Sequence, residues 1–183
     1  MASVPAEPAR WPKVVGTISI CWGGFNLLCG ACGMSMIFLM GTMTAQAEKT
    51  MGPMPDVMKP NMAQIIVGFI SFIAPVILLI AGIATVKRRP AGRSLHLTYA
   101  VISIVLSGVA TVIGFMHQMD VLEWAKHNQS DKWAKAAGSP FAYIGIAVGL
   151  FLGMAWPFFC MIWFGAIKRD NRDLDGAAPQ AVI

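Results

Sequence analysis

Residues 63–86 read AQIIVGFISFIAPVILLIAGIATV, and the segment that follows them, 87–93, reads KRRPAGR. The first stretch contains no charged residue and exceeds the roughly 20 residues that an α-helix needs to cross the hydrocarbon core of a bilayer. Three further windows also lack charged residues: 14–47, 94–119 and 136–167. Backbone groups in lipid must pair within their own segment, so runs of this length predict helices. The sequence therefore predicts an all-α integral membrane protein with spans at about 14–38, 63–86, 95–118 and 141–167.

The distribution of charge predicts which side of the membrane each loop faces. Charged residues make up 13% of the 183-residue chain, about half of their share in soluble domains. Nine of the 14 cations lie before the first span, in the 87–93 loop or after the fourth span. Because cytoplasmic loops carry the excess of Lys and Arg, we expect both termini and this loop to be cytoplasmic, at the cell membrane. The asymmetry also accounts for the net charge of +5, so we expect contact with the lipid bilayer and none with nucleic acid.

The ends of the transmembrane domain are predicted at 13 and 168. Residues 1–12 show no apolar periodicity and are expected to form a disordered cytoplasmic tail. Residues 169–183 are expected to form a second cytoplasmic tail, disordered from 173 onward. Ala45-Gln46-Ala47 follows a basic segment and an apolar run, as a signal-peptide cleavage site does. The apolar run is much longer than the roughly 7–15 residues of a signal sequence, so we expect it to be retained. Cleavage there would instead leave three spans and an external N-terminus.

The two outer segments differ in composition. Residues 41–62 are rich in Met, Pro and polar side chains, and we expect an irregular loop there. Residues 120–137 place Trp124 and Trp133 among charges. That pattern fits either a short helix lying at the membrane interface or a solvated loop.

Small residues recur along the first and third spans at alternating spacings of three and four. A repeat of 3.5 residues marks a helix seam, and in lipid such seams favour small side chains. The pattern predicts a compact four-helix bundle with this seam: Gly16, Gly23, Asn26, Gly30, Gly33, Ser103, Ser107 and Gly114. The amide of Asn26 is expected either to hydrogen-bond across the bundle, to Ser103 or Ser107, or to line a small polar pocket.

The two halves of the chain also suggest a parallel repeat of two helical hairpins. Ile18-Ser19-Ile20 with its following glycines matches Ile102-Ser103-Ile104, and Pro75 before Lys87-Arg88 matches Pro157 before Lys168-Arg169. Each half would consist of a helix, an outer loop, a Pro-bearing helix and a basic stop. Both prolines are expected to kink their helices.

Methionine supplies one candidate binding site. Eight of the 13 methionines lie between residues 34 and 62, and His117 ends the third span on the same side. Thioether and imidazole groups together select soft ions such as Cu(I). The candidate ligands are Met36, Met40, Met43 and His117. The alternative is that these methionines fill gaps and anchor the segment in lipid.

Cysteine supplies a second candidate. Cys29 and Cys32 form a C-x-x-C on one helix face, the spacing of redox and metal sites. The outer loops contain no cysteine to relay electrons, so packing beside the glycine seam is the competing interpretation.

No nucleotide-binding, hydrolase or metalloprotease motif occurs, and no Asp, Glu, Lys or Arg lies inside a span. The sequence therefore predicts a non-enzymatic accessory or interaction protein of the membrane, as a homo-oligomer or as a subunit of a larger complex. Soft-metal binding or permeation, with Cu(I), is the first alternative. A thiol–disulfide oxidoreductase centred on the C-x-x-C is the second.

Overall fold

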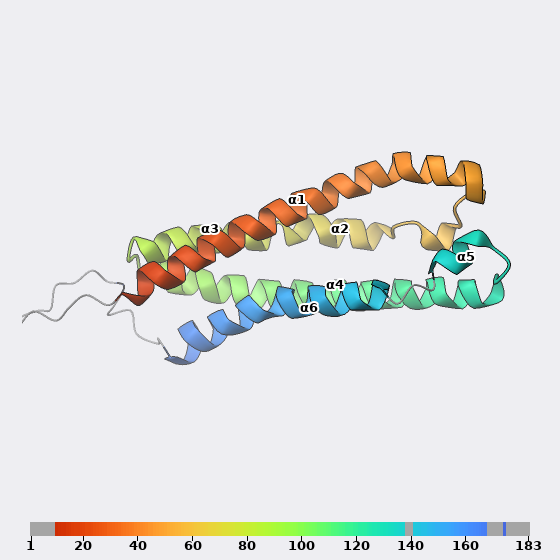
Figure 1. Cartoon of the computed structure of the whole chain (residues 1–183). Helices are drawn as coiled ribbons and strands as arrows, with labels where there is room; N and C mark the ends of the chain where they lie inside the picture. The colour runs from red at the N-terminus through yellow and green to blue at the C-terminus, as the bar shows by residue number, and fades with distance from the viewer. Residues whose placement is uncertain (1–9, 138–140, 168–173, 175–183) are drawn as a thin grey trace, which may run out of the picture. The chain divides into compact units, whose positions relative to one another are not determined.

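The computed structural model describes residues 10–137, 141–167 and 174, with the backbone alone at 36–38, 40, 136 and 141–146. All regular elements in this part are helical (Figure 1). In chain order they are α1 (Trp11–Met51), the 3₁₀-helix η1 (Asp56–Met58), α2 (Met62–Ser71), α3 (Ile73–Val86), α4 (Ala91–His127), α5 (Lys132–Ala137), α6 (Phe141–Cys160) and the π-helix η2 (Met161–Ile167).

Four helical segments are long and apolar enough to cross a membrane: Trp11–Ser35, Asp56–Val86, Ala91–His127 and Ala147–Ile167. The predicted all-helical class and the four apolar helices are therefore confirmed for the part of the chain that the structure describes.

The helix ends differ from the predicted ones. Trp11 and Pro12 belong to α1 and not to a tail, and α1 continues to Met51, so the prediction of an irregular segment is wrong for 41–51. That stretch is polar, but it is rich in Ala, Gln, Glu, Lys and Met, which are good helix formers. The helix ends where Gly52 adopts a φ of 91°, just before Pro53. Residues 1–9 lie outside the described part, and Leu174 is the one described residue of the C-terminal tail, where it is buried.

The two span prolines coincide with irregularities in their helices. Pro75 has no N–H to donate to the carbonyl of Ser71, and the second span is interrupted at Phe72, between α2 and α3. Pro157 lies inside α6, which passes into the π-helix η2 at Met161. The break at Phe72 adjoins the carbonyl that lacks a donor, as expected for proline within an apolar helix. The π-helix begins one turn after Pro157.

The chain divides into two compact units. The first comprises Met1–Leu27, Ile73–Ile102 and Trp156–Ile183, and the second comprises Leu28–Phe72 and Ser103–Ala155. The core of the first unit is an apolar cluster formed by Val15, Ala74, Leu78, Tyr99, Ala100, Cys160 and Phe164. Within the first unit, helix α3 ends in a Schellman motif. Arg88 has a φ of 54°, and the N–H of Arg89 donates to the carbonyl of Ala84 at 2.8 Å.

Candidate functional site

A buried polar centre lies in the first unit, where α1, α3 and α4 meet. His96, Ser19 and Thr85 are all fully buried. The Ser19 hydroxyl lies 2.8 Å from Nε2 of His96, and the Thr85 hydroxyl lies 3.4 Å from Nδ1. Nδ1 also lies 2.7 Å from the carbonyl oxygen of Gly92. One imidazole therefore connects three helices.

The hydrogen bonds fix where the ring carries its hydrogen. A carbonyl only accepts, so Nδ1 of His96 must donate to Gly92. In the neutral ring, Nε2 then accepts from the Ser19 hydroxyl. The Ser19 oxygen also lies 2.9 Å from the carbonyl oxygen of Val15 in its own helix. With the neutral ring, the imidazole and the Ser19 hydroxyl both have hydrogen-bond partners within this buried centre.

Aromatic rings cover the centre. The ring of Phe164 stacks on His96, with centroids 4.4 Å apart, and the edge of Trp11 meets Phe164 at 6.0 Å. The carbonyl of Phe164 in turn accepts a hydrogen bond from Nε of Arg93 at 3.0 Å. A Ser–His pair is the beginning of a nucleophilic site. Ser19 is fully buried here, however, so in this conformation its hydroxyl joins helices and cannot reach a substrate.

Glycines bring α1 and α3 into close contact in the same unit. A Cβ placed on Gly16 would lie 2.8 Å from the carbonyl oxygen of Gly82, and a Cβ on Gly82 would lie 2.8 Å from that of Gly16. Gly23 is nearly as crowded, because a Cβ there would lie 3.2 Å from the carbonyl oxygen of Pro75. Two of the predicted seam glycines therefore lie where another side chain would meet backbone.

The other predicted seam residues are placed differently. In the second unit, a Cβ on Gly30 would meet the ring of Phe72 at 3.1 Å, whereas Gly33 and Gly114 have nothing within 4 Å. The Ser107 hydroxyl lies 3.4 Å from a Cβ position on Gly153, and Ser103 is buried. Asn26 belongs to the first unit, and its amide donates to the carbonyl of Trp22, one turn earlier in its own helix, at 2.8 Å.

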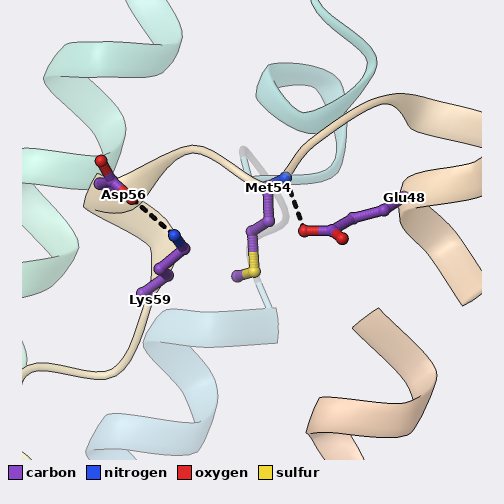
Figure 2. A network of polar contacts seen from close by, with 4 residues as sticks. All are labelled: Glu48, Met54, Asp56 and Lys59. Carbon is purple, nitrogen blue, oxygen red and sulfur yellow. Dashed lines mark hydrogen bonds and ion pairs between the residues drawn. The ribbon is translucent and has the colours of Figure 1, made fainter. Parts of the chain in front are cut away.

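Polar contacts hold residues 48–59 of the second unit. Figure 2 shows the Glu48 carboxylate accepting from the backbone N–H of Met54 at 3.0 Å, beside the exposed ion pair of Lys59 and Asp56 at 2.6 Å. Helix α5 is attached to the end of α1. There, Lys132 donates to the carbonyl of Thr50 at 2.8 Å, and Trp133 donates from its indole to that of Gly52 at 3.1 Å.

The methionine candidates fall only partly within the described side chains. Met43 is 65% exposed and His117 is partly exposed, both in the second unit. The side chains of Met36 and Met40 lie outside the described ones. Among the described residues, no group of three or more His, Cys, Asp or Glu side chains is arranged to share a metal ion. The soft-metal site thus stays a prediction.

The cysteine candidates are free thiols. Cys29 and Cys32 are both exposed on α1 in the second unit, and neither forms a disulfide. Cys21 and Cys160 belong to the first unit, where Cys21 is exposed and Cys160 is buried. The C-x-x-C pair therefore stays a prediction as well.

The contact between Ser19 and His96 was not predicted from the sequence. Both residues belong to the 3–4 repeats of the first and third spans, and this pattern could have predicted that they face each other. A buried imidazole is costly in lipid unless it forms a hydrogen bond. A hydroxyl at the same depth in another span is therefore the partner that the sequence could have predicted for it.

Comparison with known proteins assigns this chain to no family. No protein-family model, curated protein sequence or solved structure matches this chain.

Proposed function

We propose that this chain is a multi-pass protein of the cell membrane whose four spans form one helix bundle. Both termini and the 87–93 loop lie in the cytoplasm. The basic residues of that loop and of the two tails support this orientation. The contacts of the first unit support the bundle, since α1, α3, α4 and η2 meet there around His96.

The two hairpins are proposed to be parallel repeats. Pro75 and Pro157 support this, because each marks the irregularity of the second helix of its hairpin. The basic stop follows each of these helices in the sequence.

The proposed role is that of a non-enzymatic accessory or interaction protein, which binds a second copy or other membrane subunits through its helices. The observation that carries the proposal is the amount of apolar surface left uncovered. In the most apolar window of each candidate span, only 17–22% of the residues are buried. Large side chains such as Leu28, Val112 and Phe151 are 59–72% exposed. Lipid covers such faces, and so do the helices of partner subunits.

Photo-cross-linking in intact membranes tests this role. A photo-reactive amino acid is placed in turn at Leu28, Val112 and Phe151, which belong to three different helices. At least one position should give a protein adduct of defined mass, either a second copy or one other membrane protein. Native mass spectrometry in gentle detergent should show the same complex. Adducts to lipid alone at all three positions, with a strictly monomeric purified protein, would contradict the proposal.

Reporter fusions test the orientation independently. A reporter after Ile183 or within 87–93 should be cytoplasmic, and one near Asp56 or Gln129 should be external. The intact mass should include residues 1–47. A mature N-terminus at Glu48 would replace the four-span topology with three spans.

A further inference from the structure

The positive charge of the chain is concentrated in the first unit. By sequence, this unit has nine cations and four acids, whereas the second has five of each, so the net charge of +5 belongs to the first. Within its described residues there are six cations and no Asp or Glu. Four of these cations lie in the 87–93 loop. Lys87 and Arg89 are exposed there, and no acidic side chain pairs with them in the described part of the chain.

A cavity of about 440 Å³ opens where this loop enters α4. Its lining combines two chemistries: Arg93 and Ser94 are polar, whereas Pro90, Ala91 and Leu97 are apolar. The volume falls in the range of roughly 300–1,000 Å³ that is usual for ligand pockets. The cavity therefore offers a charged group and an apolar wall within two turns of one helix.

A hydrogen bond to the backbone holds the side chain of Arg93 in place. Its Nε donates to the carbonyl of Phe164 at 3.0 Å, which fixes the side chain against η2. The two terminal nitrogens of the guanidinium have no partner within the described residues. A planar guanidinium that is already oriented binds phosphate oxygens in a bidentate manner and loses less side-chain entropy on binding.

We propose that this cavity binds the phosphate group of an anionic phospholipid from the cytoplasmic leaflet. Arg93 contacts the phosphate, Ser94 flanks it, and Pro90 and Leu97 lie beside the glycerol and the start of an acyl chain. Lys87 and Arg89 add long-range attraction. The assignment rests on the orientation proposed above, which places the loop at the depth of the headgroups in the leaflet that is richer in anionic lipid.

Native mass spectrometry of the full chain, purified in mixed micelles with equal amounts of phosphatidylglycerol and phosphatidylcholine, tests the proposal. The wild-type protein should retain phosphatidylglycerol preferentially. Arg93→Gln should reduce that preference about fivefold or more, the effect expected for one cation near a charged membrane surface. Arg93→Lys keeps the charge but removes the planar guanidinium, and it should give an intermediate preference for phosphatidylglycerol. Lys126→Gln, at an exposed cation of the second unit, is the control and should leave the preference unchanged.

Several outcomes would overturn the proposal. Equal losses in Arg93→Gln and Lys126→Gln would mean that net charge alone attracts the lipid. If both Arg93 variants retained the wild-type preference for phosphatidylglycerol, the guanidinium would not be the group that binds the lipid phosphate. Displacement of the lipid by millimolar inorganic phosphate would identify a site for the free anion. Because the micelle measurement does not depend on sidedness, it can fail while the reporter fusions still place 87–93 in the cytoplasm, so the two proposals are tested separately.

Discussion

Replacing Gly16 with alanine adds one methyl group where α1 and α3 are in close contact. The new Cβ would lie 2.7 Å from a methyl of Val86, 2.8 Å from the carbonyl oxygen of Gly82 and 2.9 Å from the backbone nitrogen of Val86. Two of these atoms are backbone, so the clash cannot be relieved by rotating a side chain. Gly24, two turns further along the same helix, has nothing within 4 Å of its Cβ position. Gly24→Ala is therefore the matched control.

The expected magnitude follows from two opposing contributions to the free energy of unfolding. Glycine to alanine inside a helix stabilises by about 0.8–1 kcal/mol. That contribution applies to both variants and cancels in their difference. Overpacking a fitted interface costs about 1–3 kcal/mol, and only Gly16→Ala incurs it. The two variants should thus differ by about 1–3 kcal/mol, with Gly24→Ala at or above the wild-type stability.

The measurement is unfolding by sodium dodecyl sulfate of protein purified in a mild detergent, followed by far-ultraviolet circular dichroism. Gly33→Ala and Gly114→Ala extend the comparison to the second unit, where both positions have open space and should tolerate the methyl group. If Gly16→Ala and Gly24→Ala were equally stable, the close contact of α1 with α3 would not exist in the membrane protein. Glycine packing would then not hold the helices of the first unit together.

Further expectations concern His96, the candidate methionines and the C-x-x-C pair. His96→Ala empties a fully buried position and removes the partner of the buried Ser19 hydroxyl. It should lower the free energy of unfolding by about 2–5 kcal/mol. A loss below about 0.5 kcal/mol would show that the imidazole does not join the helices. Changing Met36, Met40 and Met43 together to Leu should abolish any preferential binding of Ag(I) over Zn(II) measured by inductively coupled plasma mass spectrometry; equal binding by the wild type and the triple variant would leave these methionines as packing residues. Replacing both cysteines of the 29–32 segment with Ala should change stability by no more than about 0.5 kcal/mol, whereas a mixed disulfide trapped on either one would establish redox chemistry.

The helices themselves could be predicted from the sequence because their cause is local. A run such as 63–86 has no charge to place in water and enough residues to span the hydrocarbon. The same is true of the interruption near Pro75, since a missing N–H acts within one turn of its own helix. The end of α1 was predicted less well. Residues 41–51 are polar and helical at once, and polarity ends a membrane span without ending a helix.

The sequence alone does not predict which faces of the helices are in contact. A 3–4 repeat identifies a stripe of small residues, but it does not say which part of the stripe is covered, and so Gly16 is crowded while Gly114 is open. Asn26 illustrates the same limit. Its amide reaches the carbonyl of Trp22 in its own helix, a partner available to any helical asparagine whatever lies opposite it. Ser19 and His96 are 77 residues apart, and only the packing of α1 against α4 brings them to 2.8 Å. The sequence determined what must leave water, because the transfer of apolar side chains into lipid depends on composition alone. The tertiary structure decided which polar groups meet, because hydrogen bonds need particular atoms at particular distances.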